Sequence, residues 1–172
     1  MATGVDTVPA LVELARHPNL WDQNTIRTKH EGTAHADASD ILVWFNREDD
    51  PDIINSLDVV AYPAWRLLPA IRALVLSVLR ELNAVRLGRV VISRLPAGGE
   101  ILPHIDQGAP AKYYDRVHVV LQAVPGVKFR CGTESVEVHT GEVWWFNNQL
   151  MHEIQNNSGH DRVVLIIDAH VE

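Results

Sequence analysis

The spacing of apolar residues separates a helical first half of the chain from a second half made of short strands. Between residues 66 and 86, apolar residues recur at steps of three and four: Leu68, Ile71, Val75, Val78, Leu82 and Val85. This spacing predicts one α-helix over about 66–86, with Pro69 near its start and Gly88 as its stop signal. A shorter helix is predicted over Pro9 to Arg16, because Pro18 ends it.

Two further segments precede the long helix. The apolar run Ile41-Leu42-Val43-Trp44-Phe45 is short enough for a buried strand, and the turn signal Asp49-Asp50-Pro51-Asp52 follows it. Residues 22–39 are polar and show no clear period. We interpret them as a loop, with an edge strand as the alternative.

From Arg89 onward, turn residues interrupt the chain about every ten positions. The predicted strands are Arg89–Leu95, Val117–Gln122, Val127–Cys131, Ser135–His139, Val143–Phe146, His152–Gln155 and Arg162–Asp168. Short strands with frequent turns are typical of an antiparallel sandwich or barrel. The predicted class is α+β, mainly β. Residues 1–88 form a helical and strand buttress, residues 89–172 form a jelly-roll core, and residues 1–172 make a single domain.

Composition excludes several function classes. The 172 residues carry a formal net charge of −7, which argues against a nucleic-acid partner. The N-terminus lacks the basic and apolar regions of a signal peptide, and no segment has the apolar length of a membrane span. The single cysteine, Cys131, cannot form an internal disulfide. We expect a soluble, cytoplasmic protein without membrane contact.

The sequence Pro103-His104-Ile105-Asp106, together with His152 far along the chain, contains the side chains of a 2-His-1-carboxylate iron site. Residues i and i+2 of an extended segment share a face, so His104 and Asp106 are able to converge on one ion. Taken alone the trio is weak evidence, because His-x-Asp is common and a single later histidine is more often a polar surface residue.

Other polar residues of the β half bear on this hypothesis. If the hairpin after His152 turns at Ser158, Arg162 points into the barrel beside His152 and would bind an anion there. The alternative is a rim arginine paired with Asp161 or Glu153. Arg116 and His118 share one strand face and would hold a carboxylate, although a half-exposed strand fits them equally well. Ser93 is either a small core residue or an accessory donor.

Together these residues resemble the aspartyl/asparaginyl β-hydroxylase family of 2-oxoglutarate-dependent iron(II) oxygenases, which have a double-stranded β-helix (cupin-like) fold. The resemblance covers residues 90–169 through Ser93…Pro96-x-Gly98…Pro103-His104, Arg116-x-His118, Gly141-Glu142-Val143…Phe146-Asn147-Asn148…His152-Glu153, and Arg162 with Ile166-x-Asp168.

This resemblance implies a role for each matching residue. His104, Asp106 and His152 would bind Fe(II) as the catalytic metal. Arg162 with Ser93 would hold the far carboxylate of the cosubstrate 2-oxoglutarate, and Arg116 with His118 would support its metal-binding end. O2 would be the second cosubstrate. The implied activity is that of a dioxygenase that hydroxylates an amino-acid side chain in a peptide or protein.

Asp106 is a departure from the best-known members, which have glycine at this position. The sequence is therefore closer to small bacterial and phage-type members and to free-proline hydroxylases, so hydroxylation of a free amino acid such as proline is the first alternative. A non-catalytic cupin-like metal-binding or structural domain is a second. A zinc or manganese cupin with isomerase or hydrolase activity is a third. His35 and Trp44 are weaker candidates for the lining of a substrate pocket, since surface and core roles explain them as well.

Overall fold

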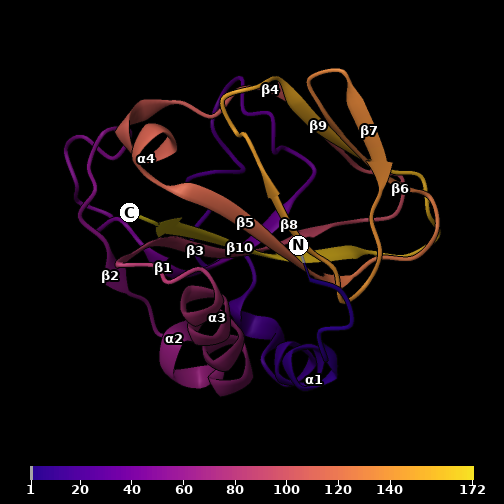
Figure 1. The fold of residues 1–172 in the computed structure, drawn as a ribbon, viewed down its shortest axis with the longest axis horizontal. Helices are drawn as coiled ribbons and strands as arrows, with labels where there is room; N and C mark the ends of the chain where they lie inside the picture. The colour runs from indigo at the N-terminus through magenta and orange to yellow at the C-terminus, as the bar shows by residue number, and fades with distance from the viewer. Residues whose placement is uncertain (1) are drawn as a thin grey trace.

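The computed structural model describes residues 2–172 and shows two facing antiparallel sheets with helices outside the larger one (Figure 1). The helices are α1 (Val8–Arg16), the 3-10 helix η1 (Pro18–Leu20), α2 (Ala64–Leu67), α3 (Pro69–Glu81) and α4 (Gly108–Tyr113). The strands are β1 (Ser39–Phe45), β2 (Val60–Ala61), β3 (Arg86–Leu95), β4 (Glu100–His104), β5 (Asp115–Gln122), β6 (Val127–Cys131), β7 (Glu134–Glu137), β8 (Val143–Phe146), β9 (His152–Asn156) and β10 (Arg162–His170).

The strand order identifies the predicted jelly roll as a double-stranded β-helix. The larger sheet has the order β2-β1-β3-β10-β5-β8, and the smaller sheet has the order β4-β9-β6-β7. From β3 onward the chain passes back and forth between the two sheets, with β6 and β7 as the one hairpin that stays in the smaller sheet. This alternation encloses a space between the sheets, and the candidate site residues face it.

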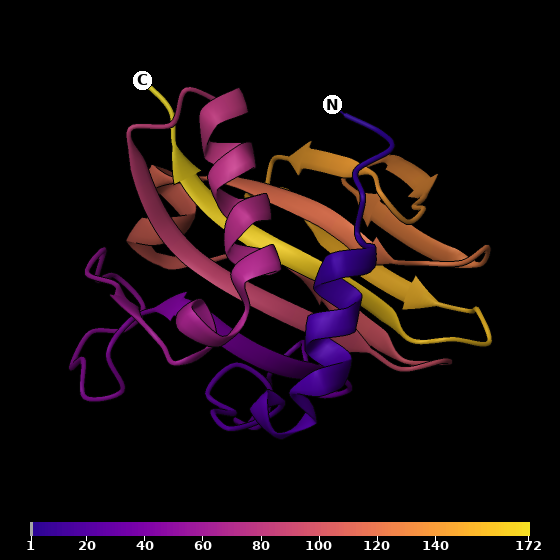
Figure 2. The same cartoon turned by 90° about the horizontal axis from the view of Figure 1, so that it is seen from below.

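The helices cover the outer face of the larger sheet, where α1 and α3 lie across its strands (Figure 2). Alternate residues of β10, namely Val163, Leu165 and Ile167, pack in this helix-covered core. The residues that alternate with them, including Arg162 and Ile166, face the space between the sheets instead. Because successive side chains of a strand point to opposite faces, one strand contributes to both the core and the site.

The prediction of one helix over 66–86 is wrong in its extent. Two helices replace it, with a break at Leu68, and α3 ends at Glu81. Asn83 adopts a positive φ of 52°, which terminates the helix, so the residues after it are free to begin β3. Gly88 is not a helix stop. It lies within β3, where a Cβ atom would come within 2.9 Å of the Tyr114 ring, so a side chain there has no room.

The assumed hairpin register between β9 and β10 is also wrong. β9 pairs with β4 and β6 in the smaller sheet, whereas β10 pairs with β3 and β5 in the larger one. Arg162 is paired with Leu95 of β3 and not with Ile154. Arg162 and His152 nevertheless line the same cavity, because each side chain points from its own sheet into the space between the two sheets.

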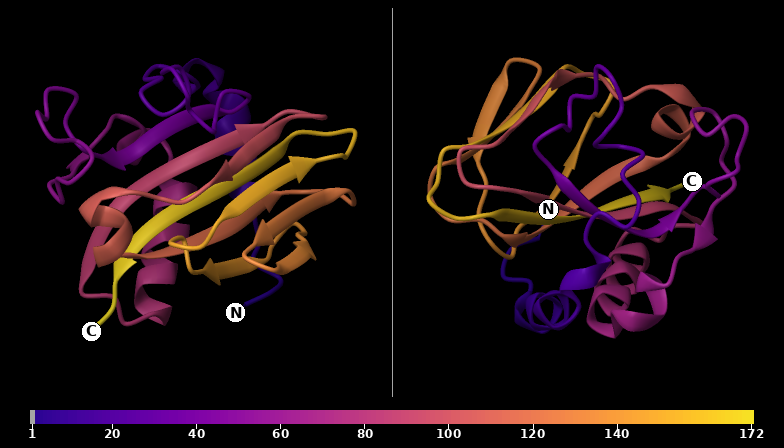
Figure 3. Two further views of the ribbon diagram at one scale, coloured as in Figure 1. Left: turned by 90° about the horizontal axis from the view of Figure 1, so that it is seen from above. Right: turned by 180° about the vertical axis from the view of Figure 1, so that it is seen from behind.

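Residues 21–38 form turns and no strand, so the alternative of an edge strand is wrong for this segment. The segment crosses the opening between the sheets (Figure 3). The backbone N–H of Leu102 donates to the Ala34 carbonyl at 2.9 Å, and Glu100 N–H donates to Asp37 Oδ2 at 3.0 Å. These bonds attach the segment to the edge strand β4, which positions it over the site. No helix within residues 2–172 has the length and apolar character needed to span a membrane.

Candidate metal centre

His104, Asp106 and His152 come together at the open end of the space between the sheets. One potential ligand atom from each lies within 4.8 Å of the others. Asp106 Oδ1 is 3.6 Å from His104 Nε2 and 3.9 Å from His152 Nε2. Two ligand atoms that are each about 2.1 Å from one ion are separated by about 3–4 Å, so this spacing suits a shared metal. β4 ends at His104 and β9 begins at His152, and these two residues are paired across the smaller sheet.

Both histidines are oriented by the same kind of backbone contact. His104 Nδ1 lies 2.8 Å from the Leu102 carbonyl oxygen, and His152 Nδ1 lies 2.9 Å from that of Leu150. A carbonyl only accepts hydrogen bonds, so Nδ1 carries the proton in each ring and the Nε2 lone pair is left toward Asp106. This tautomer is the one needed for a metal ligand through Nε2, and the second contact of each ring fixes its orientation.

Arg116 binds the other oxygen of Asp106. Its Nη1 donates to Asp106 Oδ2, while its Nε and Nη2 donate to the two carboxylate oxygens of Asp168 at 2.8 and 3.0 Å. Burial by itself opposes ionisation of Asp106, but the charge of the bonded Arg116 outweighs it and lowers the pKa of this carboxyl. Asp106 is therefore a carboxylate with Oδ1 available and Oδ2 occupied.

Arg162 is a cation buried without a partner anion. Only 4% of the residue is exposed. Within the described chain, residues 2–172, its Nε has no hydrogen-bond partner and no carboxylate forms an ion pair with it. Burial lowers the pKa of Arg162 to about 10, which leaves it charged near neutral pH. The alternative of a rim arginine is wrong, because Asp161 instead lies 4.0 Å from Arg94 and Glu153 binds Arg130.

Ser93 and His118 lie in the same cavity as Arg162, together with His104, His152 and Arg116. The His118 ring contacts Phe146, with ring centroids 4.8 Å apart. Burial, and then the positive charges of Arg162 and Arg116, hold the pKa of His118 well below its usual value, so the ring is neutral. The cavity thus combines one unpaired cation with neutral donors, an arrangement that suits a bound carboxylate.

Of the two weaker pocket candidates, only His35 reaches the site. Its ring meets that of His104 edge-on, with centroids 4.7 Å apart, and burial followed by the charge of Arg27 lowers the pKa of His35 to about 2. Trp44 packs against Trp65 in the helix-covered core instead.

The sequence pattern did not reveal Arg27, Arg89 or the role of Asp168 as the partner of Arg116. Arg89 was detectable, because it precedes Ser93 by four residues on β3 and so shares its face. Asp168 likewise lies on the inward face of β10, where it pairs with Arg116 of β5. Arg27 belongs to an irregular segment that has no period to reveal the direction of its side chain.

A family model described as aspartyl/asparaginyl beta-hydroxylase matches residues 14–171. The comparison with curated proteins gave no match. Similar solved structures include a protein described as a predicted oxalate decarboxylase from Thermotoga maritima, with 16% identity over 49% of this chain and 68% of that one and a TM-score of 0.41. A cupin domain from Bordetella pertussis Tohama I has 20% identity over 50% of this chain and 84% of its own, with a TM-score of 0.39.

Proposed function

This chain belongs to the aspartyl/asparaginyl β-hydroxylase family, and on that basis we propose that it is a 2-oxoglutarate- and iron(II)-dependent dioxygenase that hydroxylates an amino-acid side chain. The observation that carries the proposal is a His-Asp-His cluster whose two histidines line one cavity with an unpaired buried arginine. The proposed substrate residue belongs to a peptide or protein, and the proposed compartment is the cytoplasm.

The donor set fits iron(II). His104, Asp106 and His152 would hold the ion, because two imidazole Nε2 atoms and one carboxylate oxygen converge and the remaining atoms of these groups are already bonded. Two imidazoles with one carboxylate on one face are typical of non-haem iron(II) oxygenases, in which the opposite face stays open. Zinc accepts the same ligands, so membership of the hydroxylase family is what favours iron over zinc here.

The same cavity supports a dicarboxylate cosubstrate. Arg162 would bind the carboxylate of 2-oxoglutarate that lies far from the metal, since its planar guanidinium matches a carboxylate through two parallel hydrogen bonds. Ser93, which is 4% exposed, would add a hydroxyl donor. Neutral His118 adds an N–H without a second charge, and Arg116 supports the metal-binding end of the cosubstrate by fixing Asp106.

When bound, iron(II) and 2-oxoglutarate supply the oxidising power that inserts one oxygen atom of O2 into a C–H bond, with release of succinate and CO2. The residues of this chain provide placement. Arg116 and the two backbone carbonyls keep the three ligands in position before the metal arrives. Phe129 and Phe146 line the cavity beside His152, with ring centroids 6.4 and 5.0 Å from it, and exclude water from that side.

Replacement of Arg162 and of His152 tests the proposal. Wild-type protein with iron(II) should convert 2-oxoglutarate to succinate, measured by mass spectrometry of the product. Arg162→Met should reduce this conversion at least about 100-fold and weaken 2-oxoglutarate binding, but leave Mn(II) binding unchanged. His152→Ala should abolish both conversion and Mn(II) binding. Replacement of the exposed His139 by alanine is the matched control and should change neither quantity.

The results also distinguish the other functions. Conversion that persists in both variants would contradict the proposal. A wild-type protein that binds Mn(II) but gains no thermal stability from 2-oxoglutarate would favour a metal-dependent isomerase or hydrolase. A protein that binds neither would favour a non-catalytic domain.

A further inference from the structure

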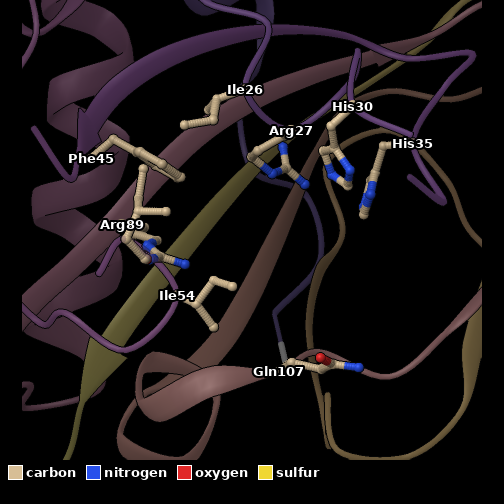
Figure 4. A pocket seen from close by; sticks show the side chains of 9 residues that line it. Ile26, Arg27, His30, His35, Phe45, Ile54, Arg89 and Gln107 are labelled. Atoms are coloured by element: carbon tan, nitrogen blue, oxygen red, sulfur yellow. The ribbon is translucent and has the colours of Figure 1, made fainter. Parts of the chain in front are cut away.

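A second cavity of about 450 Å³ adjoins the candidate metal centre. It shares His35 and Arg27 with the smaller cavity that is lined by His104 and His152 of the candidate metal cluster. Figure 4 shows its side chains, which come mainly from the segment after η1, the end of β1, the loop before β2 and the start of β3. Its volume is that of a small-molecule site. A ligand in this cavity therefore lies next to the metal ligands and outside the cosubstrate pocket.

Arg89 places an unmatched positive charge in the wall of this cavity. Its Nε donates to Asn46 Oδ1 at 2.7 Å, its Nη2 donates to the Ile53 carbonyl, and its Cζ lies 4.8 Å from the centre of the Phe45 ring, so all three identified partners are neutral. Among residues 2–172, no carboxylate lies within ion-pair distance of this guanidinium. Burial lowers the pKa of Arg89, yet a guanidinium keeps its charge at neutral pH. The two neutral acceptors fix the side chain so that its free edge points into the cavity (Figure 4).

The other cation of the cavity is already neutralised. Arg27 Nη1 binds Asp40 Oδ2 at 2.6 Å, and Asp40 is buried. The remaining polar side chains of the lining are His30, His35 and Gln107, and none of them is acidic. Of the two arginines in the lining, Arg89 is therefore the one without an ion-pair partner. The carboxylate that acts on it most strongly, Asp168, is already bonded to Arg116.

The rest of the lining is apolar. Ile26, Phe45, Ile53 and Ile54 surround the space in front of Arg89. Ile54 is 60% exposed and Ile26 is 38% exposed, so a ligand that covers them removes branched alkyl surface from water, which favours binding. Aspartyl and asparaginyl side chains have no such alkyl surface to place against these residues.

We propose that this cavity is the substrate site of the enzyme and that it selects a carboxylate next to a branched aliphatic group, with the carboxylate bound to Arg89. This inference rests on the proposed function, because the cavity becomes a substrate site through its position beside the metal ligands. The aliphatic body would contact the isoleucines and extend past His35 toward His104. Arg89 would thus be a specificity-determining residue, separate from Arg162 in the cosubstrate pocket.

Calorimetric titration with 4-methylpentanoate tests the proposal, with the uncharged and nearly isosteric 4-methylpentanamide as the comparison ligand. The protein is saturated with Mn(II) and 2-oxoglutarate, so that the acid cannot occupy the Arg162 pocket and no turnover occurs. The acid should bind at least tenfold more tightly than the amide. Arg89→Met should reduce the affinity for the acid to that for the amide. Methyl NMR should show shifts at Ile26 and Ile54.

Arg86→Met is the matched control. Arg86 lies on the same strand and also donates to a loop carbonyl, that of Leu57, but it is outside the cavity. The Arg86→Met variant should bind the acid with an affinity within twofold of that of the wild-type protein. Arg89→Lys, which keeps the charge, should bind the acid more tightly than Arg89→Met and so separates loss of charge from damage to the loop. L-Leucine and glycyl-L-leucine then distinguish a free amino acid from the C-terminus of a peptide as the natural source of the carboxylate.

Failure of this inference and failure of the proposed function give different results. Equal affinities for acid and amide, no binding of either, or an unaffected Arg89→Met would overturn the cavity proposal while 2-oxoglutarate still binds. If 2-oxoglutarate does not bind the wild-type protein, the proposed function fails. The affinities for the acid and the amide are then compared in the Arg162→Met variant without cosubstrate. A tenfold preference for the acid in this variant, if it is lost in the Arg162→Met/Arg89→Met double variant, still supports the anion site.

Discussion

At the scale of single residues, the geometry of the metal cluster depends on Arg116. Its guanidinium contacts Asp106 and Asp168 at once, so it pairs with two carboxylates and leaves Asp106 Oδ1 free for a metal. Asp168 is 1% exposed, so water cannot replace Arg116 as the partner of its carboxylate. Arg116 is a positioning residue: it acts on the metal through Asp106.

Arg116→Gln should weaken Mn(II) binding about 10–100-fold, because Asp106 loses the contact that orients it. The free energy of unfolding should fall by about 3–5 kcal/mol, because a buried carboxylate is left unpaired. Metal titration of the folded variant and urea denaturation measure the two effects. Arg130→Gln, which removes a half-exposed ion pair with Glu153, should cost less than about 1 kcal/mol. Unchanged Mn(II) affinity in Arg116→Gln would contradict the positioning role.

At the scale of elements, the start of α4 and the loop before β2 are packed backbone against backbone. Gly108 has a φ of +86°, and a Cβ atom on it would come within 2.0 Å of the Ile54 carbonyl oxygen. Gln107 and Ile54, on either side of this contact, both line the large cavity. The close approach therefore fixes the wall of the proposed substrate site.

Gly108→Ala should displace the loop that carries Ile54 and lower the free energy of unfolding by about 1–3 kcal/mol more than Gly98→Ala does. Gly98 is a matched control, because its φ is also positive, at +77°, but nothing lies within 4 Å of a Cβ there. The backbone strain is thus shared and only the steric overlap differs. Thermal and urea denaturation of both variants measure the difference, and equal losses would show that the loop yields freely.

The turn that leads into β8 makes a pH-dependent contribution to stability. Partial burial alone would raise the pKa of Glu142, but hydrogen bonds from the His139 backbone N–H and the Trp144 indole N–H, at 2.9 and 2.8 Å, lower it below 4.5. The carboxylate form is therefore favoured by folding. Its contribution is complete above the unfolded pKa and is lost as the pH falls through the folded one.

Glu142→Gln should accordingly destabilise the protein near pH 7, and its difference from wild type should shrink as the pH falls below about 4.5. Urea denaturation at a series of pH values measures this. Glu134→Gln, at an exposed position of β7, should show no such trend. A difference that stays constant down to pH 3 would mean that Glu142 contributes through shape and not through its charge.

At the scale of the whole molecule, the helices and the site occupy opposite faces of the larger sheet. Ile71 of α3 is fully buried in the core between the helices and the sheet, together with Ile92 of β3 and Leu165 of β10. β1, which comes from the first half of the chain, pairs with β3 at residues such as Ile41 and Ile92. Since both halves of the chain share this sheet and core, we expect one cooperative unfolding transition.

Ile71→Ala should lower the free energy of unfolding by about 2–5 kcal/mol, because it leaves a cavity in this core. It should leave Mn(II) affinity within twofold, because the cluster lies on the other side of the sheet. Calorimetry should show a single transition at a lower temperature. Leu76→Ala, at a residue of α3 that is 48% exposed, should change stability by less than about 0.5 kcal/mol. Two separate transitions would contradict the expectation of a single domain.

The sequence alone is enough to propose which side chains take part in the candidate metal cluster and which of them share a strand face. The spacing of two places His104 and Asp106 together, and it puts Arg116 and His118 on one face of β5 without telling which face is inward. These features are local, because the period of a strand depends only on neighbouring residues. The jelly-roll class was predictable for the same reason, from strand lengths and turn residues.

Which strands are neighbours, and which strand faces point inward, became clear only from the fold. It placed His152 and Arg162 in opposite sheets rather than in one hairpin, and it paired Arg116 with Asp168. It also brought Arg27 and His35 of an irregular segment to the site, and it ended α3 at Glu81. Contacts between distant segments depend on the packing of whole faces against one another, and a linear pattern carries no information about that partner choice. The extent of the large cavity therefore follows from the fold, whereas the candidate metal ligands beside it could be proposed from the sequence.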